Sequence, residues 1–380
     1  MPAPAQLALV AGEASGDLLA GMLLGGLRQR WPQLSAVGIG GPRMAEQGFQ
    51  AWWPHHLLAV HGYADALLHY REIAGVRRQL ARRLLERRPD AFIGVDAPDF
   101  NLGLEMQLRR QGIKTIHFVS PSIWAWRGGR VKKIARAVDH MLCLFPFEPA
   151  LYERHGIAAT YVGHPLADAI DLHPDRAGAR QALNLGATDE VVALLPGSRT
   201  SEIRHLLPRF LQAAELLRKQ RPHLRFVLPM AGGHEVLIRS LVQAGPAGLD
   251  VHCVPGQSHA VLAACDVTLI ASGTATLEAA LFKRPMVIAY HMSALSWQLM
   301  KRMRYQPWVG LPNILCESFV VPELLQAQAS PQRLAEETLG WLREPQRVAA
   351  VQERFMQLHR RLRCNTVQRA VDAIATVLQA

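Results

Sequence analysis

Two aspartates stand three positions apart at the end of a strand-like apolar run, in the sequence AFIGVDAPDFN at residues 91–101. A buried strand cannot easily hold an ionised carboxylate without a partner, so the pair marks a strand end that reaches either a cleft or a turn. Asp96 follows the strand directly and is the better candidate for a general base. Asp99 follows Pro98 and is more typical of a turn or a helix cap.

A turn of small residues in LLPGSRTSE is a candidate for binding an anion. Gly197, Ser198 and Arg199 come between a strand and a helix start, where backbone N–H groups and the helix dipole favour a phosphate. The guanidinium fork of Arg199 favours a diphosphate. The turn lacks the lysine and the spacing of a P-loop, so an ordinary turn with a surface arginine remains the alternative.

A second such turn lies in ASGTATLEAAL. Ser272, Gly273 and Thr274 again lead from a strand into a helix, and Glu278 follows one helical turn later, where it can face the same cleft. A carboxylate in this place can accept hydrogen bonds from both hydroxyls of a ribose, which leaves the turn N–H groups for phosphate. The alternative is a solvated helix residue, although the neighbours of Glu278 are apolar.

The N-terminal sequence VAGEASGDLLAG resembles a dinucleotide fingerprint only loosely. It lacks G-x-G-x-x-G, so an NAD or FAD site is not favoured. It does bring the carboxylate of Glu13 to a glycine-rich loop after a strand. The alternative is a tight turn with Asp17 near the start of the following helix.

Two basic segments contain aromatic or apolar residues. In SPSIWAWRGGR, Trp124 and Arg127 could stack on a base or contact a phosphorylated headgroup of an acceptor, or they could belong to a Trp-lined turn before a basic helix. Residues 61–88 combine an apolar segment with many arginines. Such a helix can lie on an anionic membrane surface or can present a solvated face.

Length and composition limit the classes of protein. With 380 residues and 49% hydrophobic content, the chain can form large cores and favours two domains. No apolar run approaches the ~20 residues of a membrane span, and acidic residues interrupt the N-terminal run too early for a signal peptide, so we expect a cytosolic protein. The five scattered cysteines indicate neither a disulfide framework nor a zinc site. A formal net charge of +11 indicates an acidic partner, namely nucleic acid, anionic lipid or a phosphorylated substrate.

Short apolar runs alternate with helical patterns through both halves of the chain. This rhythm predicts an α/β protein with two Rossmann-like, doubly wound parallel-sheet domains that face each other across a cleft. We expect an N-terminal domain at 1–165 with the candidate general base, a C-terminal domain at 166–340 with the two candidate anion-binding turns, and closing helices at 341–380. Ligands of such sheets bind beyond the carboxyl ends of the strands, where the candidate residues lie.

A glycosyl transfer from a nucleotide sugar fits this set of groups. Hydrolysis of a glycoside needs an acid and a base, whereas a nucleoside diphosphate leaves readily once its charge is stabilised, so a transferase needs one base. No D-x-D metal motif is present in the sequence, so Arg199 and the helix N-termini would stabilise the departing diphosphate.

A series of motifs, in this order and over nearly the whole chain, resembles the lipid-A-disaccharide synthase family of bacterial inverting glycosyltransferases with the two-domain GT-B architecture: VAGEASGD, GVDAPDFN, SPSIWAWR, VGHPLAD, LLPGSR, ASGTATLEAAL, LPNIL and RCN. The resemblance implies transfer of 2,3-diacylglucosamine from UDP-2,3-diacylglucosamine to 2,3-diacylglucosamine 1-phosphate. The products would be the β-1,6 lipid A disaccharide 1-phosphate and UDP. It also implies a cytoplasmic enzyme peripherally associated with the anionic surface of the inner membrane, with no nucleic acid partner.

The resemblance implies a role for particular residues. Asp96 would be the general base, and Glu13 would have an essential role. Arg199 would contact the diphosphate, Glu278 the ribose and Asn313 the nucleotide side of the cleft. We expect neither a cofactor nor a metal ion. Two other functions stay open from the sequence: a UDP-sugar 2-epimerase-like enzyme on the same fold, and a basic nucleic-acid-binding protein whose affinity falls steeply with salt.

Overall fold

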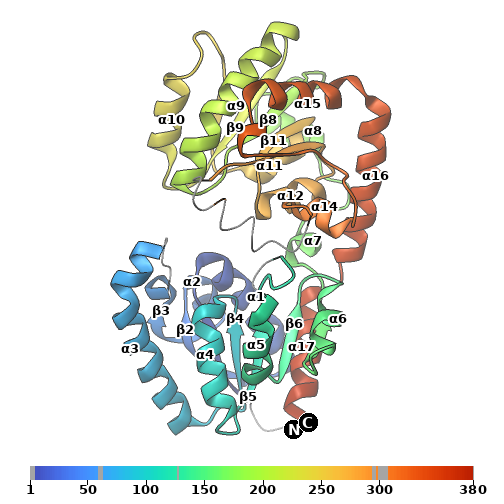
Figure 1. Cartoon of the computed structure of the whole chain (residues 1–380). Helices are drawn as coiled ribbons and strands as arrows, with labels where there is room; N and C mark the ends of the chain where they lie inside the picture. Colours follow the sequence, from blue (N-terminus) through green and yellow to red (C-terminus); the bar gives the residue numbers. More distant parts are fainter. Residues whose placement is uncertain (1–4, 59–62, 126–127, 293–296, 298–306, 380) are drawn as a thin grey trace. The chain divides into compact units, whose positions relative to one another are not determined.

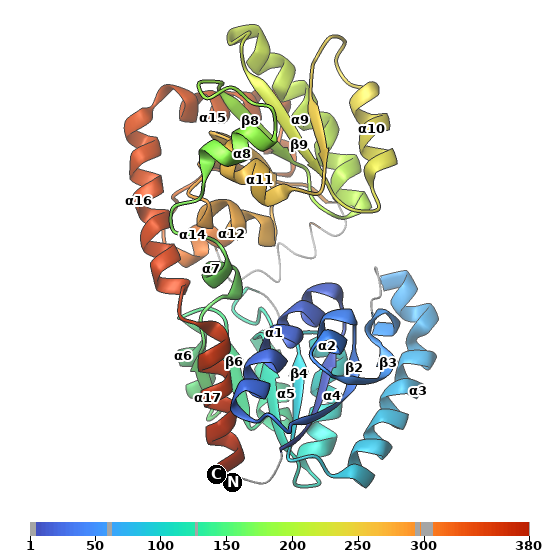
Figure 2. The same ribbon diagram turned by 180° about the vertical axis from the view of Figure 1, so that it is seen from behind.

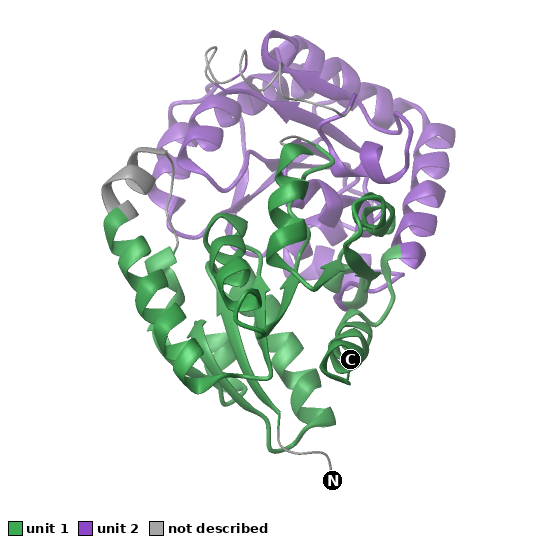
Figure 3. Ribbon diagram, turned by 60° about the horizontal axis from the view of Figure 1, so that its bottom comes forward, with its two compact units in different colours: residues 1–168, 362–380 green, residues 169–361 purple. Residues whose placement is uncertain are grey.

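The computed structural model describes residues 5–58, 63–125, 128–292, 297 and 307–379, with only the backbone described over 63–70. Figures 1 and 2 show the chain from opposite sides. It divides into two compact units, which Figure 3 colours separately: unit 1 contains residues 1–168 and 362–380, and unit 2 contains residues 169–361. The chain leaves unit 1 within α7 (Pro165–Ala169) and returns to it at the end of α16 (Pro345–Leu362).

Unit 1 is built on a seven-stranded sheet in the order β3-β2-β1-β4-β5-β6-β7, and every neighbouring pair is parallel. The strands are β1 (Gln6–Ala11), β2 (Ser35–Gly40), β3 (Gln50–Pro54), β4 (Ala91–Val95), β5 (Lys114–Phe118), β6 (His140–Cys143) and β7 (Ala158–Tyr161). The strand order changes direction between β1 and β4. This switch point is where doubly wound sheets bind ligands.

Helices cover both faces of this sheet (Figures 1 and 2). They are α1 (Ala14–Arg30), α2 (Pro42–Glu46), η1 (His55–Leu58), α3 (Tyr63–Arg87), α4 (Pro98–Arg109), η2 (Gly128–Arg130), α5 (Val131–Ala137), α6 (Glu148–Glu153) and α17 (Thr366–Gln379). Alternate residues of β1 enter different cores: Leu9 packs with α1 and α17, whereas Val10 packs with α3 and α4. A strand buried on both faces explains the continuous apolar run in the sequence.

Unit 2 repeats the plan with a six-stranded parallel sheet in the order β10-β9-β8-β11-β12-β13. Its strands are β8 (Val191–Leu195), β9 (Arg225–Met230), β10 (His252–Pro255), β11 (Val267–Ala271), β12 (Met286–Tyr290) and β13 (Glu323–Leu325). Its described helices are α8 (Arg176–Ala182), α9 (Thr200–Gln220), α10 (Glu235–Gln243), α11 (Ser258–Ala264), α12 (Thr274–Leu281), α14 (Leu311–Leu315), η3 (Gln326–Gln328), α15 (Pro331–Arg343) and α16. The switch point of this sheet lies between β8 and β11.

The two parallel sheets confirm the predicted fold class. The C-terminal helices, expected together as a closing layer at 341–380, divide between the units, because α16 belongs to unit 2 and α17 to unit 1. The apolar residues Val371 and Ile374 of α17 join the core beside α1. A Cβ atom at Gly26 of α1 would lie 2.3 Å from Val367, so glycine permits the close approach of these two helices.

Candidate functional site

Two turns of unit 2 meet at its switch point. β8 ends at Leu195 and β11 ends at Ala271, and these neighbouring strands pair Ile270 with Leu195. The turn after β8 leads into α9 at Thr200, and the turn after β11 leads into α12 at Thr274. Two helix N-termini, each with a partial positive charge, therefore begin beside one another at this edge of the sheet.

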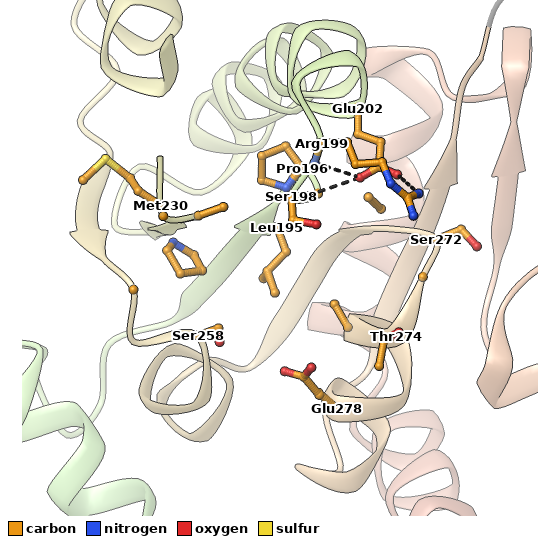
Figure 4. Close-up of a pocket in the computed structure, with 18 residues that line it drawn as sticks. Leu195, Pro196, Ser198, Arg199, Glu202, Met230, Ser258, Ser272, Thr274 and Glu278 are labelled. Atoms are coloured by element: carbon orange, nitrogen blue, oxygen red, sulfur yellow. Dashed lines mark hydrogen bonds and ion pairs between the residues drawn. The ribbon is translucent and has the colours of Figure 1, made fainter. Parts of the chain in front are cut away.

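A pocket of about 480 Å³ opens at these turns, and all its lining residues belong to unit 2 (Figure 4). It brings together the following residues predicted to contact the nucleotide: Gly197, Ser198, Arg199, Ser272, Gly273, Thr274 and Glu278. Met230, Gly256 and Ser258, from the ends of β9 and β10, complete one side and are not among the predicted site residues. They reach the pocket only through the sheet order, which no local pattern reveals.

Glu202 fills the anion-binding part of the turn after β8. Its carboxylate accepts hydrogen bonds from the backbone N–H groups of Ser198 (3.2 Å) and Arg199 (3.4 Å), and from the Arg199 guanidinium at 3.1 Å. Figure 4 shows these contacts on the α9 side of the pocket. Glu202 is not among the predicted site residues, although a glutamate three positions after a helix N-cap is a capping signal. The turn thus binds a carboxylate of its own chain with the donors expected to face a phosphate.

The backbone at Gly197 requires glycine. Its φ of 107° lies in the region that other residues avoid, and an added Cβ atom would lie 2.4 Å from the Glu202 carboxylate. The Arg199 side chain, in contrast, is 80% exposed and can turn toward a ligand. The turn combines a fixed backbone with an adaptable guanidinium.

Glu278 lies on the α12 side of the pocket, where its side chain is 20% exposed (Figure 4). His259, in the first turn of α11, places Nε2 3.3 Å from the carboxylate. The hydrogen bond to Glu278 raises the pKa of His259, while burial acts in the opposite direction. His259 is a further residue that the sequence pattern does not connect with this site.

Asn313 does not line the pocket, as far as the described residues define it. Its buried amide accepts hydrogen bonds from the N–H groups of Val320 and Val321 and donates to Glu323 at 2.8 Å. Glu323 in turn accepts hydrogen bonds from the N–H groups of residues 309 and 310, and Ser272 donates from Oγ to the carbonyl of residue 309 at 3.1 Å. In this structure Asn313 supports the chain behind Ser272.

Asp96 and Glu13 follow neighbouring strands of unit 1, at the switch point of its sheet. β4 ends at Val95 and β1 ends at Ala11, and these two residues are paired. Asp96 is partly exposed, and Glu13 is exposed at the N-cap of α1, where its side chain makes no capping hydrogen bond to that helix. Asp17, in the same helix, instead accepts hydrogen bonds from backbone N–H groups at the start of α2.

The expectation that Asp99 caps a helix is wrong. The N-cap of α4 is Ala97, and Asp99 lies in the first turn of the helix with 81% of its side chain exposed. Its carboxylate pairs with Arg130 at 2.5 Å. Asp99 is therefore paired with a cation, and Asp96 is the carboxylate that stands directly at the strand end.

Trp124 is tied into unit 1 by several groups, and the paired candidate Arg127 lies outside the described residues. The indole N–H donates to the carboxylate of Glu148 at 3.0 Å, and the ring meets Phe145 and Phe147 edge to face. Burial raises the pKa of Glu148 to about 7, against the opposing effect of its hydrogen-bond donors. Trp124 is therefore held in place beside a carboxyl group whose charge is sensitive to pH near neutrality.

The described part of α3 turns its apolar side to the core. Val76, Leu80 and Leu84 are buried there, and the guanidinium of Arg83 lies 4.2 Å from the ring centre of Trp52. Arg78 and Arg82 are exposed. Among the described helices, none has both the length and the apolar character needed to cross a membrane.

Comparison with known proteins identifies the family. Residues 7–374 match the family model described as lipid-A-disaccharide synthetase. The chain is 61% identical to the lipid-A-disaccharide synthase of Albidiferax ferrireducens, over 98% of this chain and 97% of that relative. The chain belongs to the lipid-A-disaccharide synthetase family. It is a glycosyltransferase of lipid A biosynthesis, and the epimerase and nucleic-acid alternatives are not favoured.

Solved structures show how widely this fold is shared. The calicheamicin glycosyltransferase CalG4 aligns with a TM-score of 0.63 at 16% identity, with 99% of each chain covered. A UDP-N-acetylglucosamine 2-epimerase from Listeria monocytogenes, described as putative in its own name, aligns with a TM-score of 0.65 at 11% identity, over 99% of this chain and 96% of the other. The fold is thus the GT-B type, and membership of the family, not the fold, distinguishes a transferase from an epimerase.

The motifs VGHPLAD and RCN lie together in unit 1 and have structural roles. A Cβ atom at Gly163, in VGHPLAD, would lie 2.6 Å from Cys364, in RCN. Asp168 accepts hydrogen bonds from the N–H groups of Asn365 (2.9 Å) and Thr366 (2.6 Å), at the start of α17. These motifs fix the return of the C-terminal helix to unit 1.

Proposed function

We propose that this glycosyltransferase transfers 2,3-diacylglucosamine from UDP-2,3-diacylglucosamine to 2,3-diacylglucosamine 1-phosphate. The products are the β-1,6 lipid A disaccharide 1-phosphate and UDP. The observation that carries the proposal is the unit 2 pocket, where two helix N-termini, an exposed arginine and a carboxylate line one cavity in a chain of this family.

The donor nucleotide binds in that pocket. Its diphosphate accepts hydrogen bonds from the backbone N–H groups of the turns at Ser198 and Thr274. The Arg199 guanidinium leaves Glu202 and forms a bidentate contact with the phosphates. The Glu202 carboxylate must then move off the turn, since two anions cannot share the same donors. The ribose hydroxyls donate to Glu278.

The reaction is an in-line displacement with inversion. Asp96 accepts the proton of the acceptor 6-hydroxyl, whose oxygen forms a bond to the anomeric carbon of the donor as the bond from that carbon to the diphosphate oxygen breaks. The electron pair of the broken bond leaves with UDP. Arg199 and the N-termini of α9 and α12 stabilise the charge that develops there. Glu13, at the neighbouring strand end, completes the acidic side of the acceptor site.

The acceptor and the membrane account for the positive charge of the chain. The acceptor carries a phosphate, and the net charge of +11 with the exposed arginines of α3 favours an anionic membrane surface. We place the enzyme on the cytoplasmic face of the inner membrane as a peripheral protein. Changing Arg78 and Arg82 to Ser should reduce flotation with anionic liposomes, and undiminished flotation would refute this contact.

The test is an assay of the purified chain with both substrates, a chelator and no added metal, with the disaccharide detected by mass spectrometry. Wild type should form the disaccharide, whereas Asp96→Asn should lose about 100- to 10,000-fold in turnover and retain its affinity for UDP. Asp99→Asn is the matched control, because it removes a carboxylate three positions away, and it should remain active. Full turnover by Asp96→Asn would remove Asp96 as the base. Absence of disaccharide from folded, UDP-binding wild type would refute the proposed substrates or the metal-free reaction.

A further inference from the structure

The turn that carries Asp96 has an unusual backbone. Asp96 has a φ of 52° and Ala97 a φ of 43°, so two successive residues other than glycine lie in the left-handed region. Aspartate enters this region more readily than most residues, but alanine has no such tendency. Such a conformation lowers the stability of the fold, and it persists only when its surroundings hold it there.

Asn101, the last residue of the GVDAPDFN motif, provides such a restraint. It is fully buried on α4, and its amide Nδ2 donates to the carbonyl of Asp96 at 2.8 Å. The same nitrogen lies 3.4 Å from the carbonyl of Val10, near the end of β1. One side-chain amide thus connects β1 and β4, between which the strand order of the sheet changes. β4 leads to Asp96, and β1 leads to Glu13.

The backbone of Asn101 also joins this turn. Its N–H donates to the carbonyl of Ala97 at 3.0 Å, and the N–H of Asp96 donates to the carbonyl of Phe118, on β5, at 2.9 Å. Asp96 is therefore bonded through both its N–H and its carbonyl. Of these contacts, the one from the Asn101 side chain is the one a substitution can remove without altering the backbone.

A buried polar pair packs behind Asn101. Glu105, one helical turn further along α4, lies 2.7 Å from Nδ1 of His117 on β5, and neither side chain is exposed. Gly94, on the strand between them, makes room: a Cβ atom there would lie 2.2 Å from the Glu105 carboxylate and 2.9 Å from Cβ of Asn101. Burial raises the pKa of Glu105, while His117 acts to lower it.

This cluster is a poor choice for stability alone. Asn101 Oδ1, Glu105 Oε2 and His117 Nε2 are buried without a hydrogen-bond partner among the described residues. Each such atom lowers the stability of a fold, and apolar residues of similar size would avoid this penalty. A polar cluster that lowers stability directly beneath a strained, functional turn points to a role in positioning.

We infer that Asn101 is a positioning residue for Asp96: its amide fixes the left-handed turn after β4, so that the Asp96 carboxylate meets the acceptor hydroxyl, while the Glu105–His117 pair supports the amide from behind. The inference rests on the proposed role of Asp96 as the base. Asn101 makes no contact with the substrate in this scheme and acts only through the Asp96 turn.

The test compares Asn101→Ala with Thr115→Val. Thr115 is a buried residue of the same unit, at the start of β5, and its hydroxyl donates to the carbonyl of Ala137 at 2.9 Å. Both variants lose a buried hydrogen bond, but only Asn101→Ala alters the Asp96 turn. We expect Asn101→Ala to lower kcat about 100-fold, with KM for both substrates and Kd for UDP changed less than about twofold. Thr115→Val should lower the unfolding temperature and retain kcat.

A double variant separates a positioning role from a general loss of structure. If Asn101 acts through Asp96, then Asp96→Asn combined with Asn101→Ala should be no slower than Asp96→Asn alone. Effects that multiply would overturn the inference, as would Asn101→Ala with normal kcat. Should Asn101→Ala fail to fold, Asn101→Ser offers the same comparison, because its hydroxyl is too short to replace the contact to Asp96.

The same experiment distinguishes this inference from the proposed function. Full activity of Asp96→Asn would remove the base itself, whatever Asn101 does. Loss of activity in Asp96→Asn together with normal kcat in the Asn101 variants would overturn only the positioning role.

Discussion

The two sheets of this glycosyltransferase place very different turns at their switch points. In unit 2 the turn after β8 uses Gly197, whose φ of 107° leaves backbone N–H groups facing a pocket. In unit 1 the turn after β4 places Asp96 and Ala97 in the left-handed region without glycine. Both turns follow a strand that borders the switch point of its sheet, yet one presents its backbone and the other presents a side chain.

The difference follows from what each turn must do. A backbone that binds an anion needs close approach, and glycine gives it without steric conflict. Its donors are already paired with Glu202, so this turn is complete before a ligand binds. A turn that aims a carboxylate needs a fixed direction, which strain and a buried amide provide at the expense of stability. Variants of unit 2 should therefore change affinity for UDP, and variants of unit 1 should change turnover or stability with UDP affinity intact.

The largest effect should come from Gly197→Ala. Alanine at this φ would be strained, and its Cβ atom would overlap Glu202, so we expect a loss of about 4 kcal/mol in stability of the turn and at least 100-fold in UDP affinity. Gly256→Ala is the matched control: it lines the same pocket at a φ of 63°, but a Cβ atom there meets nothing within 4 Å. Calorimetric titration with UDP measures the affinity of both variants. Equal losses in the two variants would show that the overlap with Glu202 has no effect.

The pH dependence of stability should be the next largest effect, and it belongs to unit 1. The pKa of Glu148 is raised to about 7 in the folded chain from 4.5, so the folded state binds the proton more tightly. The stabilising contribution of protonated Glu148 to the free energy of unfolding is therefore complete below about pH 4.5. It is lost as the pH rises through about 7, and the total loss is about 3 kcal/mol. Glu148→Gln, which copies the neutral carboxyl group, should remove this slope.

Denaturant unfolding between pH 5 and pH 8 measures the slope. Glu153→Gln, at an exposed position of the same helix, is the control and should follow wild type. Parallel curves for wild type and Glu148→Gln would mean that Glu148 is ionised throughout this range. UDP affinity should stay constant in all three proteins, because Glu148 belongs to unit 1, whereas all the residues that line the pocket belong to unit 2.

A smaller effect should come from Gly12→Ala. A Cβ atom at Gly12 would lie 2.8 Å from Cβ of Ala97, so the variant forces the two strand-end turns of unit 1 apart. We expect a loss of about 2 kcal/mol in the free energy of unfolding and a lower kcat. Ala97→Gly removes the second atom of this overlap. In a double-mutant cycle of unfolding free energies, it should therefore restore stability to Gly12→Ala, and strict additivity would show that the overlap relaxes in another way.

What the sequence could predict depends on distance along the chain. Ser272 and Glu278 stand in one strand–turn–helix segment, so their spacing alone places them together. The position of Glu202 can also be predicted from the local sequence, because a glutamate three residues after a helix N-cap is a capping signal. Met230 lines the pocket from the end of β9, and His259 contacts Glu278 from α11, so only the sheet order brings these residues to the site. The amphipathic pattern of α17 likewise identifies an apolar face without naming its partner, which is why its return to unit 1 was not predicted.

Roles within a motif are harder still, because residue type does not reveal direction. Asn313 in LPNIL and Asn101 in GVDAPDFN both stand in predicted motifs, yet each directs its amide to a backbone carbonyl inside its own unit. Aspartate is a residue type that favours helix N-caps, but Asp99 pairs with Arg130 instead. Such assignments require the orientation of a side chain, which depends on contacts distant in sequence.

The smallest effect should come from Glu278→Gln, the most specific test of the unit 2 pocket. The amide keeps the shape of the side chain but loses the charge that strengthens hydrogen bonds from ribose hydroxyls, so UDP affinity should fall about tenfold. Wild type should bind UDP more tightly than 2′-deoxy-UDP, and the variant should discriminate less between them. His259→Gln is the control, since it keeps the carboxylate, and it should change UDP affinity less than about threefold. If the variant retains full discrimination against the deoxynucleotide, Glu278 does not contact the 2′-hydroxyl, and the pocket must orient the ribose through other groups.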